Sequence, residues 1–139
     1  MKQWIMILIA SVAILANVTS CRELPTDKAL DHQWRMVSVE YADGTVTDPG
    51  ERYYCFYRHT AELTSWGAIN YVANMEQTDN LIKLSFPDQD PRYLKYWGIV
   101  VPEELDTDFS VVFEVRKLTS STLILEDLSC GTVLTMRKF

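Results

Sequence analysis

The stretch FEVRKLTSSTLILEDLSCGTVLTMRKF, residues 113–139, has the pattern of three consecutive β-strands separated by two polar turns. The first strand begins upstream at Phe109 and alternates apolar and polar residues as far as Leu118, the period of a strand with one buried face. The turns at 119–121 and 129–131 are short enough to join antiparallel neighbours. The expected inner face carries Phe109, Val111, Phe113 and Val115, and then Leu123 and Leu125 on the returning strand.

Five further segments upstream have strand composition, rich in aromatic and β-branched residues. They are 34–41, 52–59, 61–66, 68–75 and 81–86. Roughly eight strands with hairpin-length connections predict an all-β fold, an antiparallel up-and-down meander closed or nearly closed as a barrel. Closure is favoured because an open sheet of this size leaves two unpaired edges.

The longest interruption of the strand pattern lies between 86 and 109. Its best helix candidate is 91–97, which starts at a proline, and a single turn from Pro102 is the alternative. An eight-stranded barrel is just wide enough to be filled by side chains or to hold one small ligand. Bulky inward residues are expected to close one half, which leaves a shallow apolar cup at the end bordered by 88–108. Its expected contacts are Tyr93, Tyr96 and Trp97.

The chain begins with an apolar segment that is too short for an ordinary membrane helix. Lys2 precedes an uncharged run over 4–16, whereas a transmembrane helix needs roughly 20 apolar residues. This combination is typical of an export signal. Residues 18–20, Val-Thr-Ser, then lead directly to Cys21, which resembles the lipobox of bacterial lipoproteins. The resemblance implies that Cys21 carries a diacylglycerol thioether and anchors the protein to a membrane; a plain secretory signal is the alternative.

These patterns divide the chain into a signal peptide over 1–20 that is removed, a tether over 21–31 and a barrel domain over 32–139. The tether is polar and is interrupted by Pro25. Arg22 follows the cysteine, where an aspartate in lipoproteins of this kind often signals retention in the inner membrane. The resemblance therefore implies the outer membrane.

The domain also resembles the small lipocalin-like (calycin-like) lipoproteins of Gram-negative bacteria. A strand beginning Trp-x-x-Val, here at Trp34, opens the domain, and the last strands follow a recurrent order. This order is a Phe-led strand, Leu-Thr, a polar turn, a Leu-x-Leu strand and an ending near Arg-Lys-aromatic. The resemblance implies a calycin-like cup, outer-membrane anchoring and a binding function. The matching positions are Phe113, Leu118, Thr119, Leu123, Leu125, Arg137, Lys138 and Phe139.

The composition and motifs give no support for catalysis or nucleic-acid binding. The formal net charge is −6 and the basic residues are scattered, whereas phosphate binding needs a basic face. The sequence has no G-x-S-x-G, H-E-x-x-H, P-loop or paired C-x-x-C motif, and its only histidines are His32 and His59. The acidic loops lack calcium-binding spacing. We expect no enzyme activity, no cofactor, no metal and no nucleic-acid partner.

Two classes of function fit these observations. In the first, the barrel mouth binds a small apolar or aromatic molecule at the aromatic residues near 93–97. In the second, those residues and the tyrosine-rich run over 52–58 pack into a core that fills the barrel. The protein is then a non-catalytic interaction or structural protein that docks on another protein of the cell envelope. The sequence does not separate the two, because the inward-facing volume depends on strand register.

The remaining cysteines, Cys55 and Cys130, leave a disulfide open, since an exported compartment permits one. Both are expected near the barrel end where the first strand finishes. One intervening strand would hold them about 10 Å apart, beyond bonding distance, unless that strand has ended by Tyr41. The expectation is slightly against the bond. Mass spectrometry of a non-reduced digest tests it through the presence or absence of a linked Cys55–Cys130 peptide.

Replacing the predicted anchor, Cys21→Ser, should release the protein from the membrane fraction as a soluble or unprocessed form. The physical reason is that acyl chains contribute about 0.8 kcal/mol per buried methylene, so two or three of them hold a protein on a bilayer. Detergent partitioning of the wild type and the variant measures the effect. A soluble wild-type protein that begins at another residue would contradict the anchor.

Overall fold

The strands follow the predicted pattern along residues 27–103 and 108–139, which the computed structural model describes. The observed bounds of β6 and β7 equal the predicted segments 81–86 and 109–118, and η1 equals the helix candidate 91–97. Within the described ranges, no helix is long and apolar enough to cross a membrane. The elements are α2 (Asp27–Leu30), β1 (Gln33–Glu40), β2 (Val46–Thr47), β3 (Arg52–Tyr57), β4 (Thr60–Ser65), β5 (Ala68–Thr78), β6 (Leu81–Phe86), the 3-10 helix η1 (Pro91–Trp97), β7 (Phe109–Leu118), β8 (Thr122–Asp127) and β9 (Val133–Lys138).

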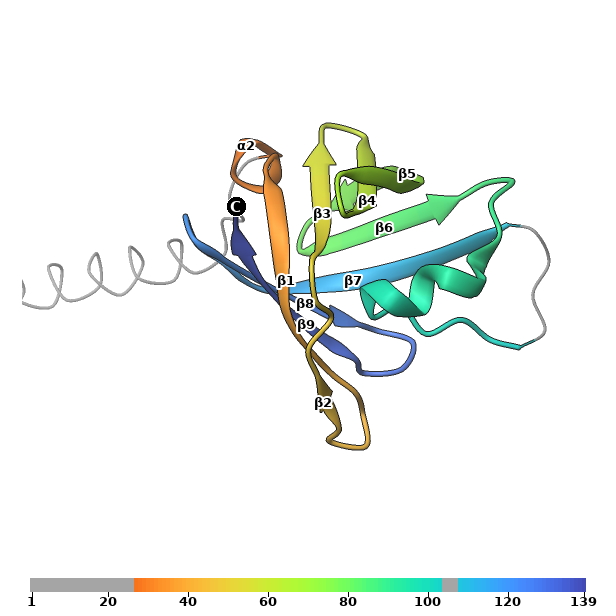
Figure 1. Cartoon of the computed structure of the whole chain (residues 1–139). Helices are drawn as coiled ribbons and strands as arrows, with labels where there is room; N and C mark the ends of the chain where they lie inside the picture. Colours follow the sequence, from red (N-terminus) through yellow and green to blue (C-terminus); the bar gives the residue numbers. More distant parts are fainter. Residues whose placement is uncertain (1–26, 104–107) are drawn as a thin grey trace, which may run out of the picture.

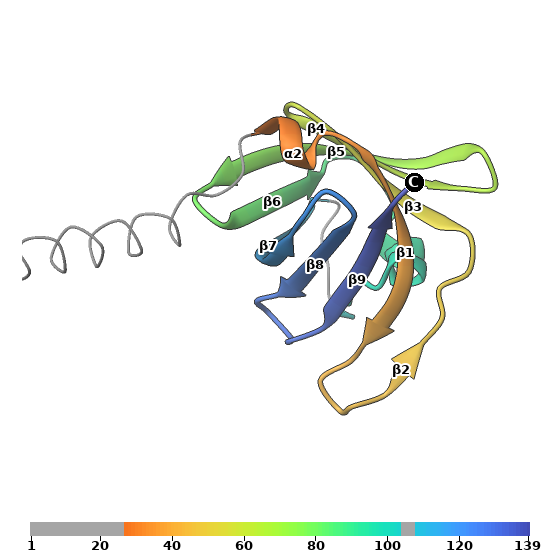
Figure 2. The same ribbon diagram turned by 90° about the vertical axis from the view of Figure 1, so that its left-hand side faces the viewer.

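The sheet closes on itself through antiparallel pairing of β1 with β9 (Figures 1 and 2). One edge of β1 pairs with β9 from Trp34 to Glu40. The other edge pairs with β3 near its start and with the two-residue strand β2 near its end. β2 and β3 therefore occupy one strand position of the barrel together, so that the nine strands form an eight-stranded barrel. The structure confirms the predicted closed, up-and-down antiparallel barrel.

Side chains from alternate positions fill the barrel, as the sequence pattern predicts. On β7 the predicted inner face is buried as far as Phe113, and Val115 is half-buried against the core. On β1 the alternation changes phase at a β-bulge between Met36 and Ser38, so that Val39 also points inward. The largest fully buried side chains are Trp34, Tyr54, Phe86, Phe113, Leu30, Met36, Leu63, Ile82, Leu84, Leu94, Ile99 and Leu123.

The short helix α2 covers the end of the barrel at which β1 begins. Leu30 is buried in the core, and its carbonyl accepts a hydrogen bond of 3.0 Å from Trp34 Nε1. A buried indole N–H needs such a partner. Residues 27–31 belong to the predicted tether; in the structure, Asp27–Leu30 form α2 and Leu30 is buried in the barrel core.

The opposite end, where β1 ends and β9 begins, is here named the mouth. Because the strands run alternately up and down, the connection from β6 to β7 crosses the mouth and carries η1. Leu94, Trp97 and Ile99 of this connection are buried in the core. They fill the centre of the mouth, where the sequence predicted a shallow apolar cup. Any ligand site at this end must lie beside η1 rather than beneath it.

Gly98 lets η1 approach the barrel wall. It has a φ of +75°, a conformation that L side chains rarely adopt, and its N–H contacts the carbonyls of Leu94 and Lys95. A methyl group placed there would overlap the Leu134 side chain and lie 3.1 Å from a methyl of Val39. Both neighbours belong to the closing pair of strands, so only glycine allows η1 to end against the β1–β9 seam.

We expect Gly98→Ala to lower the free energy of unfolding by about 1–3 kcal/mol, because the added methyl group overpacks the seam. Gly44→Ala is the matched control: Gly44 also has a positive φ, +88°, but has no other atom within 4 Å of the added carbon. Urea unfolding followed by circular dichroism measures both variants. An equal decrease in the free energy of unfolding for the two variants would show that backbone strain, and not the contact with the seam, determines the effect at position 98.

Candidate functional site

The helix η1 begins and ends with specific local interactions. Asp90 lies at its N-cap and accepts a hydrogen bond of 3.0 Å from the backbone N–H of Arg92, and Pro91 takes the first helical position. The Arg92 guanidinium also pairs with the Asp90 carboxylate at 2.6 Å. These hydrogen bonds from Arg92 lower the pKa of Asp90, whose carboxylate they stabilise in its charged form.

A 3-10 helix has three residues per turn, so side chains three apart lie above one another. In η1 this rule separates three faces. Leu94 and Trp97 form the buried face. Two other pairs are exposed, Tyr93 with Tyr96 and Arg92 with Lys95. One helix therefore fills the mouth with one face and presents an aromatic face and a basic face beside it.

Trp97 is held in place from several sides. Its indole N–H donates to the Thr64 carbonyl at 3.2 Å, and its own carbonyl accepts a hydrogen bond of 2.6 Å from Tyr54 Oη. Its ring packs edge-to-face against Tyr71, with 5.8 Å between ring centroids. Burial, and then the nearby Asp127 carboxylate, raise the pKa of Tyr54, so this donor stays protonated. Trp97, predicted as a ligand contact, is only 3% exposed and is chiefly a structural residue.

The aromatic face of η1 borders a depression of about 250 Å³, here named the aromatic pocket. Tyr93 and Tyr96 are 53% and 45% exposed, and their rings are stacked, with centroids 6.4 Å apart and planes 10° from parallel. The structure thus brings the three residues predicted as ligand contacts into one pocket. The described residues that line it are Arg52, Ser65, Asn70, Tyr71, Tyr93, Tyr96 and Trp97.

Among the residues that the structure describes, Arg52 is the one cationic side chain that lines the aromatic pocket. Its guanidinium carbon lies 5.0 Å from the ring centroid of Tyr96 and 5.7 Å from that of Trp97, within range of cation–π attraction. Its Nη1 donates to the Pro49 carbonyl, whereas its Nε is buried and has no hydrogen-bond acceptor. In the sequence, Arg52 stands out only as the first residue of the tyrosine-rich run over 52–58, because strand alternation does not reveal which arginine faces the mouth.

Tyr71 and Gln89 attach the η1 connection to β5. Tyr71 Oη donates to the Asp90 carbonyl at 2.5 Å and accepts from the Tyr93 N–H at 3.3 Å. Burial is the main cause of the raised pKa of Tyr71. The Gln89 side chain accepts from the Val72 N–H at 3.0 Å and donates to the Val72 carbonyl at 2.7 Å. These four hydrogen bonds hold the η1 connection against β5, and two of them involve Tyr71, which lines the aromatic pocket.

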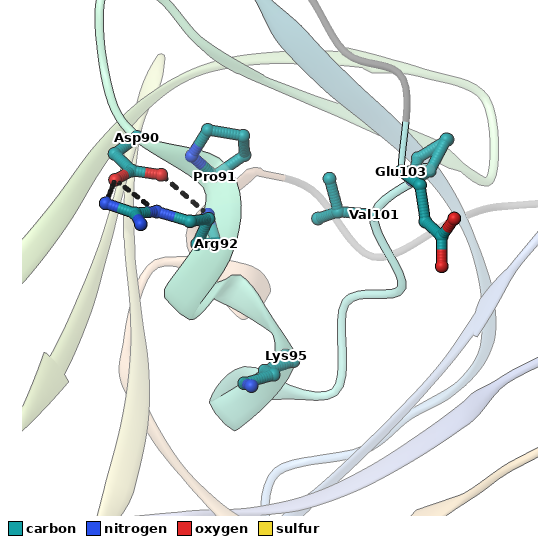
Figure 3. A pocket seen from close by; sticks show the side chains of 7 residues that line it. Asp90, Pro91, Arg92, Lys95, Val101 and Glu103 are labelled. Carbon is teal, nitrogen blue, oxygen red and sulfur yellow. Dashed lines mark hydrogen bonds and ion pairs between the residues drawn. The ribbon is translucent and has the colours of Figure 1, made fainter.

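A second depression, of about 460 Å³, lies at the basic face of η1 (Figure 3). Val101 and Glu103 lie across from the helix in this view. Its charges are mixed, and Asp90 and Arg92 are already paired with each other. Within residues 27–103 and 108–139, no three His, Cys, Asp or Glu residues are grouped closely enough to hold a metal ion.

Neither Cys55 nor Cys130 lines the aromatic pocket. Cys21 falls outside the described residues. Cys55 pairs with Gln33 at the α2 end of the barrel, whereas Cys130 lies in the turn at the mouth, next to Thr132 Oγ1 at 3.1 Å. The expectation that they share one end is therefore wrong, because β3 pairs with the start of β1 and β2 pairs with its end. Both thiols are free in the structure, and burial raises the pKa of Cys55.

Comparison with known proteins places this barrel in a family. Residues 14–139 match the family described as lipocalin-like domain. A lipocalin-like protein from Bacteroides uniformis has a similar crystal structure, with a TM-score of 0.62, 25% identity and coverage of 80% of this chain and 99% of its own. An uncharacterized protein from Bacteroides eggerthii has the same fold, with a TM-score of 0.61, 20% identity and coverage of 78% and 98%.

None of the curated proteins matches the chain. The assignment therefore depends on the family match, which extends from residue 14 to the C-terminal Phe139 and includes every strand of the barrel. The two similar crystal structures agree with the fold. The chain belongs to the lipocalin-like domain family.

Proposed function

We propose that this protein is a non-catalytic, lipid-anchored protein of the outer membrane that binds a small aromatic molecule in the aromatic pocket. The observation that carries the proposal is the stacked pair Tyr93 and Tyr96 beside the guanidinium of Arg52. Two ring faces and a planar cation suit a flat ligand, because aromatic rings gain from offset or edge-to-face packing. The lipocalin-like barrel, a fold that supports binding of small molecules, agrees with this role.

The pocket is also built like a binding site rather than a chance depression. Its walls come from β3, β4, β5 and η1, and Tyr71 and Trp97 beneath it are held by hydrogen bonds. A preformed site loses little conformational entropy when a ligand binds. At about 250 Å³, it suits a molecule of one or two rings.

The anchoring part of the proposal is supported by the sequence alone. An export signal and a lipobox-like stretch precede Cys21, and Arg22 follows it. A ligand-binding protein attached to the outer membrane fits this arrangement.

One observation favours the second candidate, an interaction protein of the cell envelope. The barrel is filled by side chains from Leu30 at one end to Trp97 at the other. In addition, the β4–β5 turn presents Trp66, which is 77% exposed, beside Ile69, which is 59% exposed. Exposed apolar side chains of this kind are common at protein interfaces.

We expect the wild-type protein to bind the neutral fluorescent probe N-phenyl-1-naphthylamine, and Tyr93→Ala or Tyr96→Ala to weaken binding about fivefold each. The reason is that one aromatic contact contributes about 1 kcal/mol. Fluorescence titration measures the dissociation constants.

Tyr57→Ala is the matched control, because Tyr57 is 66% exposed and lies at the far end of β3, outside the pocket. It should leave the dissociation constant unchanged. If the wild type binds no probe, or if all three variants bind equally well, ligand binding at this pocket is wrong and the interaction protein becomes the better account.

A further inference from the structure

Arg52 has no ion pair among the described residues, a property that it shares with Arg35, Arg58 and Arg137 but not with Arg92 and Arg116. Arg92 is paired with Asp90, and Arg116 with Glu114 and Glu126. In the part of the chain that the structure describes, no carboxylate lies within ion-pair distance of Arg52, and none lines the aromatic pocket. An uncompensated cation faces the pocket of a protein whose net charge is −6.

The hydrogen bonding of Arg52 is also incomplete. A guanidinium has five N–H donors, and here Nη1 donates to the Pro49 carbonyl. Among the residues described, Arg52 Nε and Asp127 Oδ2 are the buried side-chain polar atoms without a partner. Nε is buried and so out of a ligand's reach, whereas Nη2 has no hydrogen-bond partner among the described residues and is not buried. Because Arg52 lines the pocket, Nη2 is the donor available to a ligand, and a hydrogen bond between two charged groups is stronger than one to a neutral acceptor.

The position of the guanidinium is fixed before any ligand binds. The rings of Tyr96 and Trp97 lie 5.0 and 5.7 Å from it, and the Pro49 carbonyl holds its other edge. The neighbouring Asn70 amide cannot replace it as a donor, because its N–H groups are directed to Ser65 Oγ at 2.8 Å and to the Ala68 carbonyl at 3.1 Å.

From this geometry we infer that the ligand of the aromatic pocket is a small aromatic carboxylate, with its ring against Tyr93 and Tyr96 and its carboxylate on Arg52. This inference rests on the proposed binding function and adds its charge specificity. A carboxylate fits the observations better than a neutral ring, because only an anion compensates the unpaired cation and accepts from the guanidinium edge. The pocket volume of about 250 Å³ limits the ligand to one or two rings.

The test compares two probes of the same shape, 2-naphthoate and its neutral amide, 2-naphthamide, by titration calorimetry with the full-length protein. The wild type should bind 2-naphthoate about tenfold more tightly, the effect expected for hydrogen bonds to a charged group. Arg52→Met should remove this preference, so that its affinities for 2-naphthoate and 2-naphthamide agree within about twofold. Arg52→Lys, which keeps the charge but loses the planar edge, should give an intermediate preference.

Arg58→Met is the matched control, because Arg58 also lies over a tyrosine ring, 5.5 Å from Tyr57, but outside the pocket. It should keep the full preference. Equal binding of both probes by the wild type, or a preference that persists in a folded Arg52→Met protein, would overturn the carboxylate inference and leave the binding function intact. If neither probe binds and Tyr93→Ala does not weaken the binding of N-phenyl-1-naphthylamine, the proposed function itself fails. Because the wild-type comparison needs no variant, the test stands even if Arg52→Met does not fold.

Discussion

The antiparallel pairing of β1 with β9 is the constraint on which the other features depend. It joins Trp34 to Lys138 at one end and Glu40 to Val133 at the other, and so turns a meander into a closed wall. The β-bulge between Met36 and Ser38 keeps the interior of this seam apolar, because it brings Val39 inward after Trp34 and Met36. Trp34 then binds the Leu30 carbonyl at one end of the seam, and Gly98 packs against Val39 at the other. Both ends of the barrel are therefore closed by segments that contact β1.

The three-residue period of η1 links this closure to the candidate site. Because Leu94 and Trp97 must point inward to fill the mouth, Tyr93 and Tyr96 must share another face and remain exposed. An α-helix of the same sequence would rotate each residue by about 100°, and the two tyrosines would not stack above each other as closely. The exposed tyrosine pair is thus a consequence of the inward orientation of Leu94 and Trp97, which close the mouth of the barrel. A residue that stabilises the fold, Trp97, and residues available to a ligand, Tyr93 and Tyr96, are neighbours on one short helix.

Much of the fold could be predicted from sequence because each long strand has its own local signal. Alternation at 81–86 and 109–118 gave correct bounds, since one face of each strand is buried. Val46 and Thr47 were missed because β2 is short and exposed on both faces, so it has no alternation to detect. The aromatic residues 93–97 were found as candidates, but Arg52, Asn70 and Tyr71 join them only through cross-strand register. Cross-strand register also explains why Cys55 was predicted at the wrong end of the barrel. β2 pairs with the end of β1, so β3 pairs with its start and brings Cys55 opposite Gln33.

The position of α2 has a consequence for the direction from which a ligand arrives. The described chain enters the barrel at the end covered by Leu30, whereas the aromatic pocket lies at the mouth. With a lipid on Cys21, the stretch to Asp27 reaches at most roughly 20 Å, which keeps the α2 end close to the bilayer. In a form anchored through Cys21, the mouth would lie at the end of the barrel farther from the anchor. Such an orientation suits capture of a water-soluble molecule in transit past the membrane surface, and it does not suit extraction of a lipid from the leaflet that holds the anchor.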